Sequence, residues 1–413
     1  MTIDKDLFFY DLAIVAILKD EGHYLKEWLD YHLLAGVDHF YLYDNDSTDN
    51  QAEVAKPYIE AGLVDYFHAP GKLMQYAVYN DAVNKFRFYC RYIAFIDLDE
   101  FIYPKDTTSP IAEILDEILH GNKNAAGLSI HWQCFGSNGQ EKADYSIGVL
   151  ERFTRRSKKD FNDRVRVNEE GLHQSIGNNF FKSILNPRRI KRMHTHYAIY
   201  FEGYNSVDEN GEKLLPAFAH YPVVAEKIVL NHYFIKSREE FNLKRMRGRA
   251  YSGGEWSDHL FEHCNRNEEF DDGILKYRAA RAEKFFLESN TSRLSRVTNA
   301  LNKTLSAYAN DKISDLETAF TCRLASHYLD LAVYEEASLA AILKSLNDLK
   351  FPEIQLLMSE LPNLLSLPYA SVDELRKASI QIIRQTMDFM REKKFWDEFS
   401  ELDYLCRLLQ AWR

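Results

Sequence analysis

The sequence contains no apolar stretch of the roughly 20 residues that a helix needs to cross a lipid bilayer. The apolar segment nearest the start, LAIVAIL (Leu12 to Leu18), has seven residues and lies between Asp11 and Lys19. It is typical of a buried strand and not of a signal peptide or a membrane anchor. We therefore expect a cytoplasmic protein, and peripheral association with the inner face of the cell membrane stays open.

Cysteine pairs and excess positive charge are also missing. The five cysteines are dispersed and form no CxxC pair, which argues against a disulfide framework and against a thiolate metal site. The net charge of −11 argues against a nucleic-acid partner, because such binding depends on neutralising phosphates. Residues 151–200 nevertheless hold twelve Lys and Arg against five Asp and Glu. This basic segment is either a solvated face or a site for an anionic ligand.

Beyond about residue 285 the sequence has no glycine and only three prolines, Pro352, Pro362 and Pro368. This part reads as several amphipathic helices packed together. We therefore predict two domains, 1–280 and a helical C-terminal domain 281–413, and the second domain is a candidate for homodimer contacts.

The first 130 residues alternate between strand-like and helix-like hydrophobic periods. Strand patterns such as LAIVAIL, HFYLYD, LVDYFHA and YIAFIDLD alternate with helical segments, for example GHYLKEWLDYHLLAG. This order predicts an α/β fold with a mostly parallel sheet flanked by helices. Ligands of such sheets gather beyond the carboxyl ends of the strands.

Acidic residues follow two of the predicted strands. YDNDSTDN places Asp44 and Asn45 after the second strand, and FIDLDE places Asp97 and Asp99 at the end of the fourth. If the fourth strand continues through Asp99, the two aspartates point to the same side and Glu100 to the other. Two carboxylates at a sheet edge suit a hard divalent cation with open positions for phosphate oxygens.

Simpler interpretations of the acidic loops compete with a metal site. An isolated DxD is more often only a cap for the next helix. An EF-hand is excluded, because the sixth residue counted from Asp44 is Asp49 instead of Gly and the twelfth is Ala55 instead of Glu. A haloacid dehalogenase-type phosphatase is disfavoured, since its motif follows the first strand and this one follows the fourth.

Several further segments between about residues 10 and 250 form an ordered set. They are AIVAILKDEGHYLKEWLDYHLLAGVDHFYLYDNDSTDN, PGKLMQYAVYNDAV, DLDEF, HWQCFGSNG, ERFTRR, KSILNPRRIKRMHTH and NHYFIKSREEFNLKRMRG. In this order they resemble glycosyltransferase family 92, a branch of the family 2-like GT-A enzymes. The resemblance implies a GT-A fold that binds a nucleoside-diphosphate sugar and transfers the sugar with inversion.

Residue by residue, the resemblance implies a donor site and a metal site. Asp44 would hold the base, most often uracil, and Asp97 the ribose or the metal. Asp99 would bind Mn²⁺ or Mg²⁺, and a late histidine, with His196 preferred over His194, would complete the metal shell. The remaining donor-binding candidates are Lys19, Glu21, Asn45 and Arg189.

The acceptor side is less well marked. Inversion needs a general base for the acceptor hydroxyl, and we nominate Glu151, with Asp163 as a rival. Either carboxylate could instead be a partner of neighbouring arginines. Trp132 and Phe135 could form an apolar platform for an acceptor sugar, although aromatic residues on a strand are usually core.

We therefore expect a metal-dependent, inverting glycosyltransferase that moves a hexose, with galactose as the leading candidate, from a UDP-sugar to a glycan or lipopolysaccharide-type acceptor. A nucleotidyltransferase is disfavoured, because KDEGHY after the first strand carries a single glycine and cannot form a glycine-rich phosphate loop. A non-catalytic glycan-binding or scaffold protein with the same fold remains the alternative.

Overall fold

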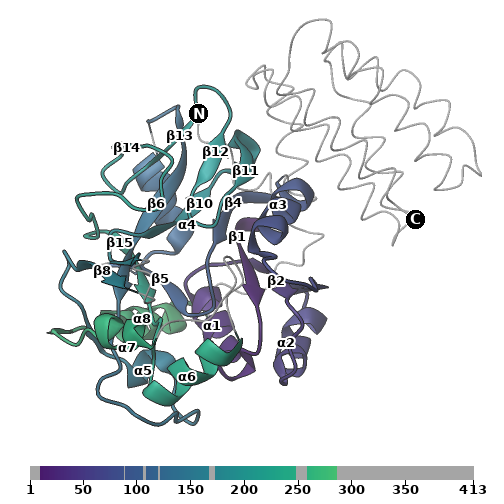
Figure 1. The fold of residues 1–413 in the computed structure, drawn as a ribbon. Coiled ribbons are helices and arrows are strands. Elements are labelled where there is room, and N and C mark those ends of the chain that lie inside the picture. The colour runs from purple at the N-terminus through teal and green to yellow at the C-terminus, as the bar shows by residue number, and fades with distance from the viewer. Residues whose placement is uncertain are drawn as a thin grey trace, which may run out of the picture. The chain divides into compact units, whose positions relative to one another are not determined.

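The computed structural model describes residues 10–285, with gaps at 88, 106–107, 120, 167–172 and 248–257. Figure 1 shows this part as a coloured ribbon. The predicted helical domain 281–413, and the homodimer contact expected from it, lie outside the described residues except for 281–285. In the described part, no helix combines the length and apolar character that a bilayer-spanning segment requires.

Strands and helices alternate as predicted up to residue 95, where two strands follow each other before the next helix. In order they are β1 (Tyr10–Leu18), α1 (Gly22–Leu34), β2 (His39–Asp44), α2 (Gln51–Glu60), β3 (Val64–His68), α3 (Gln75–Phe86), β4 (Cys90–Phe95), β5 (Glu100–Pro104), α4 (Ile111–Leu119) and β6 (Ala125–Cys134).

Shorter elements follow. They are α5 (Val149–Arg152), β7 (Arg155–Arg156), β8 (Asn162–Arg166), β9 (His173–Gly177), β10 (Phe181–Leu185), the 3₁₀ turn η2 (Pro187–Arg189), β11 (Ile190–Met193), β12 (Ala198–Tyr200), β13 (Asn205–Val207), β14 (Lys213–Leu214), β15 (Ile228–His232), α6 (Arg238–Arg247), α7 (His259–Cys264), β16 (Glu269–Phe270) and α8 (Gly273–Phe285).

The central sheet runs in the order β14-β13-β6-β10-β4-β1-β2-β3, and β15 joins it by pairing with β5 and β6. The pairs β1–β2, β2–β3 and β1–β4 are parallel. β10 is inserted antiparallel between β4 and β6. The mostly parallel, helix-flanked sheet predicted from the alternation is confirmed, and one strand in its middle runs in the reverse direction.

The side chains on both faces of β1 are largely apolar and buried. Leu12, Ile14 and Ala16 join the main hydrophobic core together with α1 and α4. On the opposite face, α3 packs through Tyr79 against Phe95 of β4, with ring centroids 4.9 Å apart. The core therefore fixes the strand ends from two sides.

Three neighbouring side chains of α1 attach this helix to β5. The Trp28 indole donates to the Glu100 carbonyl at 2.8 Å, and the Tyr31 hydroxyl donates to the Ile102 carbonyl at 2.7 Å. The ring of His32 accepts the Ile102 N–H at 3.3 Å. These bonds hold the start of β5, and with it the turn that carries Asp97 and Asp99.

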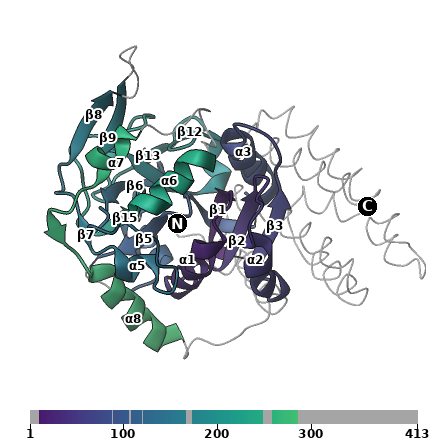
Figure 2. The same cartoon turned by 60° about the horizontal axis from the view of Figure 1, so that its bottom comes forward.

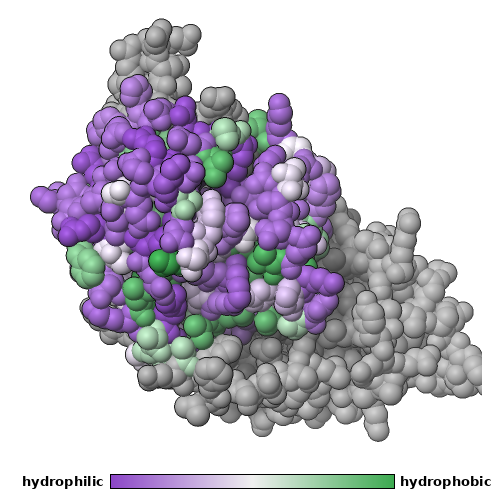
Figure 3. All heavy atoms as spheres, turned by 90° about the horizontal axis from the view of Figure 1, so that it is seen from below, coloured by the Kyte–Doolittle hydropathy of each residue, from purple (hydrophilic) through white to green (hydrophobic). Residues whose placement is uncertain are grey.

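The surface seen from below is mostly hydrophilic, with hydrophobic residues in small separate groups (Figure 3).

Helix α6 lies across the ends of the central strands (Figure 2). Arg247 in its last turn holds it there by donating to the carbonyls of Lys19 at 2.7 Å and Asp20 at 3.1 Å. This helix closes one side of the pocket described next.

Candidate active site

A cavity of about 830 Å³ lies at the carboxyl edge of the sheet. Its lining includes the ends of β1, β6, β9 and β15, the turn between β4 and β5, the starts of α3 and β10, and residues of α6 and α7. The side chains that the sequence predicted here and that line the cavity are Lys19, Glu21, Asn45, Asp97, Asp99, Trp132, Phe135 and His196. The remaining candidates, Asp44, Arg189, Glu151 and Asp163, are not part of this lining.

Asp97 and Asp99 both line the cavity, but they do not alternate along one strand as the sequence suggested. β4 ends at Phe95, and both aspartates lie in the turn before β5. The turn forms because the Glu100 N–H donates to the Asp97 carbonyl at 3.0 Å and the Asp97 N–H donates to the Glu100 carboxylate at 2.8 Å. Glu100 is fully buried and does not line the cavity.

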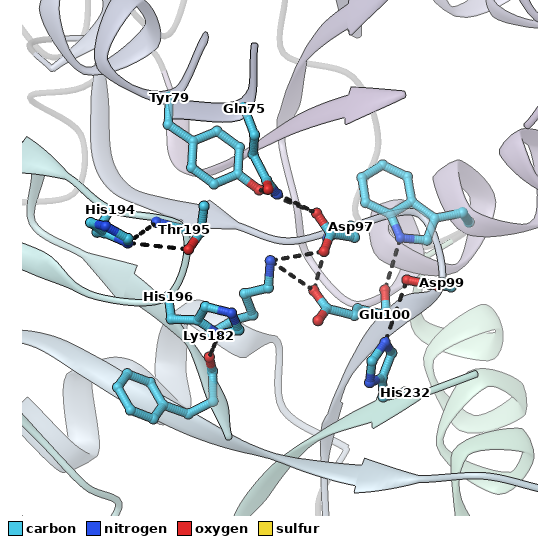
Figure 4. Close-up of polar contacts among 12 residues, drawn as sticks. Gln75, Tyr79, Asp97, Asp99, Glu100, Lys182, His194, Thr195, His196 and His232 are labelled. Carbon is cyan, nitrogen blue, oxygen red and sulfur yellow. Dashed lines mark hydrogen bonds and ion pairs between the residues drawn. The ribbon is translucent and has the colours of Figure 1, made fainter. Parts of the chain in front are cut away.

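Asp97 is held by three donors (Figure 4). Its carboxylate accepts from Lys182 Nζ at 2.9 Å, from Gln75 Nε2 at 3.0 Å and from the Tyr79 hydroxyl at 3.3 Å. Lys182 is only 2% exposed and also lies 3.7 Å from Glu100. The Lys182 charge is therefore shared by two carboxylates.

Asp99 is 4% exposed and lies among positive charges. Its carboxylate is ion-paired with Lys244 of α6 and lies 3.7 Å from Nε2 of His232. Burial alone would raise the pKa of Asp99, but the nearby Lys244, His232 and Lys236 hold it well below its usual range. Asp99 is therefore ionised at neutral pH.

Strand direction explains two differences from the predicted site. β10 runs antiparallel to β4, so its first residues lie at the carboxyl edge of the sheet and its last residues at the opposite edge. Lys182 therefore reaches Asp97, whereas Arg189 donates to the carbonyls of Lys123 at 3.3 Å and Ala125 at 3.2 Å. Lys182 was missed because the direction of a short strand cannot be read from its apolar pattern.

The structure brings His232 next to Asp99, while His196 lies on another wall. β15 pairs with β5 so that His232 faces Glu100, the residue after Asp99. The ring of Trp132 packs against both histidines, with centroids 4.2 Å from His232 and 5.5 Å from His196. His196 donates from Nδ1 to the Phe181 carbonyl at 2.8 Å and lies near Lys182.

The loop after β2 is mainly used for internal hydrogen bonds. Asp44 accepts the Ser47 N–H at 2.9 Å, and Asp49 accepts the Gly22 N–H at 2.7 Å at the start of α1. A Cβ at Gly22 would lie 2.5 Å from an oxygen of the Asn50 side chain, so a larger residue there would displace this loop side chain. Asn45 lines the cavity and donates to the Gly71 carbonyl at 2.8 Å, which positions a second loop beside the cavity.

The two aromatic residues predicted for the acceptor differ in availability. Phe135 is 1% exposed and packs on Tyr233 in the core. The rings of Phe180 and His232 both pack against Trp132, at 5.3 and 4.2 Å between centroids. The indole N–H of Trp132 is buried and has no hydrogen-bond partner in the described part of the chain. Phe218, 40% exposed, presents an aromatic surface at the same wall.

Both nominated bases are paired with basic side chains, and neither lines the cavity. Glu151 is an exposed residue of α5 and accepts from Arg278 at 2.7 Å. Asp163 lies 3.0 Å from Nδ1 of His263 and 3.9 Å from Arg266. Their positions favour the alternative role as partners of basic side chains.

The chemistry of Asp99 and His232 fits a divalent cation in part. Within the described ranges, no group of three His, Cys, Asp or Glu side chains is placed to hold a metal ion. A carboxylate and an imidazole are suitable ligands for Mn²⁺. The Lys244 ammonium, however, is a competing positive charge that already lies against Asp99. The residues therefore fit a metal ion that takes its other ligands from phosphate oxygens and water.

Comparison with known proteins identifies a protein family whose model matches this chain. A model of glycosyltransferase family 92 matches residues 15–253, more than half of the chain. A family 92 protein of Ricinus communis is 28% identical over 170 residues, 41% of this chain and 30% of that protein. A galactan beta-1,4-galactosyltransferase of Arabidopsis thaliana is 25% identical over 202 residues, 42% of this chain and 38% of that protein. The chain thus matches well under half the length of these relatives.

Solved structures show more distant likeness. TarS of S. aureus in complex with UDP is 13% identical, with 93% of this chain and 92% of that chain covered and a TM-score of 0.29. Glucosyl-3-phosphoglycerate synthase of Mycobacterium tuberculosis, solved with Mn²⁺, UDP and glucosyl-3-phosphoglycerate, is 17% identical over 30% of this chain and 44% of that chain, with a TM-score of 0.21. At these scores neither structure supports an argument about this chain.

Proposed function

Since this chain belongs to glycosyltransferase family 92, we propose that it is a metal-dependent, inverting glycosyltransferase that moves a hexose from a UDP-sugar to a glycan. The observation that carries the proposal is the cavity at the carboxyl edge of the sheet, where Asp97 and Asp99 meet Lys182, Lys244 and His232. Galactose is the preferred hexose, because one relative is a galactan galactosyltransferase. A lipopolysaccharide-type acceptor stays a prediction.

The nucleotide end of the donor is assigned to the cavity wall made by Lys19, Asn45 and the loop at Gly71. Asn45 ties this loop to the end of β2 through its bonds to the carbonyls of Ala69 at 2.7 Å and Gly71 at 2.8 Å. A preformed wall of this kind lowers the entropic cost of holding a ribose and base.

The diphosphate is assigned to the cationic side of the cavity, which Lys182, Lys244 and Arg247 line. These groups stabilise the negative charge that develops on a departing nucleoside diphosphate. When bound, Mn²⁺ or Mg²⁺ supplies further positive charge there, and Asp99 with His232 would hold it. Asp97, Asp99 and Glu21 pair with these three cations, while Lys19 and Lys72 add positive charge to the lining.

The acceptor is assigned to the aromatic wall beyond Trp132. Phe180 and Phe218 line the cavity there together with the ring of Trp132. Sugar rings combine apolar faces with hydroxyl edges, which matches a wall of this composition. The inverting course and the identity of the base stay predictions.

Nucleotide binding tests the proposal. We expect UDP to bind the full-length chain, and Mn²⁺ to raise its affinity, because the metal adds charge next to Asp99. In Asp99→Asn the metal-dependent gain should fall by at least about tenfold. The matched control is Asp160→Asn, an exposed aspartate that does not line the cavity. Calorimetry of UDP with and without Mn²⁺ measures all three proteins.

Two outcomes would contradict the proposal. If wild type binds no UDP in the presence of Mn²⁺ or Mg²⁺, the transferase proposal fails and a glycan-binding or scaffold role is left. If Asp99→Asn retains the full Mn²⁺-dependent gain, the metal site is assigned to the wrong residues.

A further inference from the structure

Lys244 takes a position that a metal ion would also require. It belongs to the last turn of α6, and its ammonium is ion-paired with Asp99. The same Nζ donates to the Phe234 carbonyl at 3.2 Å and lies 4.1 Å from the centroid of the Phe234 ring. With its side chain 14% exposed, Lys244 also lines the cavity.

We propose that Lys244 is an exchangeable counter-ion of Asp99, which makes divalent metal binding depend on the nucleoside diphosphate. This inference rests on the proposed function. Without nucleotide, the ammonium occupies the side of the carboxylate to which a cation would bind. With nucleotide, the diphosphate offers the ammonium another anionic partner in the same cavity, and Asp99 is released for the metal ion.

Charge repulsion is the first reason for this coupling. A divalent ion at Asp99 would lie at contact distance from the Lys244 ammonium, and like charges at such distances repel strongly where water is scarce. Lys236 adds to this repulsion, because it is only 5% exposed and acts on Asp99 electrostatically. Its Nζ lies over the Tyr24 ring, 4.4 Å from the centroid.

The shortage of ligands is the second reason. Asp99 and His232 supply two donors, and no third ligating side chain joins them in the described part of the chain. Mg²⁺ and Mn²⁺ sites of this kind are completed by substrate phosphates and water. The diphosphate therefore brings the missing ligands at the same moment as it attracts Lys244.

Lys182 is not equivalent to Lys244, although it also pairs with an aspartate. It belongs to β10 inside the sheet and lies between Asp97 and Glu100, at 2.9 and 3.7 Å. If Lys182 moved away from Asp97, the fully buried Glu100 carboxyl group would also lose its nearby cation. Lys182 is thus a fixed charge, whereas Lys244 is at the end of a helix that borders the cavity.

Direct titration of Mn²⁺ into the full-length chain, without nucleotide, tests the inference. We expect weak Mn²⁺ binding by wild type and binding tighter by roughly tenfold or more in Lys244→Met, since the competing charge is gone. Lys244→Arg, which keeps the charge, should stay as weak as wild type. Arg245→Met is the matched control: it removes the same charge one residue further along α6, where Arg245 pairs with Asp258 at 2.9 Å. Its Mn²⁺ affinity should equal that of wild type.

Repeating the titration with saturating UDP completes the test. Wild type should then bind Mn²⁺ far more tightly, and the gain from UDP should be smaller in Lys244→Met. Equal Mn²⁺ affinity of wild type and Lys244→Met without UDP would overturn the inference. Should Lys244→Met fail to fold, Lys244→Gln takes its place, and equal affinity of wild type with and without UDP overturns the inference by itself. Absence of UDP binding in wild type contradicts the proposed function instead.

Discussion

Single side chains set the charge of the cavity, because each acidic residue that lines it faces a basic one. The pairs are Asp97 with Lys182, Asp99 with Lys244, and Glu21 with Arg247. Carboxylates paired in this way avoid the cost of isolated buried charges. A diphosphate that enters competes with the carboxylates for the same cations.

The nominated base Glu151 provides a prediction at this scale. Because its carboxylate is exposed, pairs with Arg278 and does not line the cavity, Glu151→Gln should keep kcat/KM within about twofold of wild type. Asp163→Asn should behave likewise, since Asp163 contacts His263 instead of the cavity. Initial rates of transfer or donor hydrolysis measure both variants.

A large effect would change the account. If Glu151→Gln lost activity by orders of magnitude while its thermal unfolding matched wild type, Glu151 would be restored as the base. The cavity would then need to extend toward α5.

Among the elements, α6 matters most, since it carries Lys244 and Arg247. Its start is a capping box: the Ser237 hydroxyl donates to the Glu240 carboxylate at 2.5 Å, and the Glu240 N–H donates back to Ser237 at 3.3 Å. The same carboxylate forms a two-bond pair with Arg152, at 2.9 and 2.7 Å. Both partners are buried, so this pair fixes the helix against α5.

Breaking this pair should destabilise the protein in a pH-dependent way. We expect Arg152→Met to lose about 3 to 5 kcal/mol of unfolding free energy at pH 7, the usual cost of leaving one buried charge unpaired. Burial would raise the pKa of Glu240, but bonds from Arg152 and Ser237 outweigh it and lower the pKa to about 2 from the usual 4.5. The ionised Glu240 carboxylate therefore contributes its full stabilisation of the folded state above pH 4.5, and this stabilisation is lost as the pH falls toward 2.

Denaturant unfolding at several pH values measures this loss. The difference in unfolding free energy between wild type and Arg152→Met should become smaller as the pH falls from 4.5 toward 2. Arg155→Met, which removes an exposed arginine three residues later, is the control and should change stability little. If this difference in unfolding free energy stays constant from pH 4.5 to 2, the pH dependence does not come from Glu240.

At the scale of elements, the fold was readable wherever hydrophobic period and length were clear. The β1-to-β4 alternation and the buried stripe of α1, with Leu25, Trp28 and His32, follow from the pattern. The end of β4 was not readable, because Ile96 and Leu98 continue the apolar pattern into a turn closed by Glu100. The positions of Lys182 and His232 depend on strand direction and pairing, which only long-range contacts reveal.

For the whole molecule, a net charge of −11 coexists with a cavity that several cations line, namely Lys19, Lys72, Lys182, Lys244 and Arg247. Charges concentrated in a cleft attract anionic ligands even when the whole protein is acidic. This contrast supports a phosphate-bearing small molecule as the partner.

The most direct test of the account is release of UDP from UDP-sugars by the full-length chain with Mn²⁺, with and without a β-linked galactan acceptor. We expect UDP-galactose to be consumed, removal of Mn²⁺ with a chelator to lower the rate, and the acceptor to raise it. GDP- and TDP-sugars should be consumed more slowly. If no nucleoside-diphosphate sugar is bound or consumed, with Mn²⁺ or with Mg²⁺, the proposed glycosyltransferase function is contradicted.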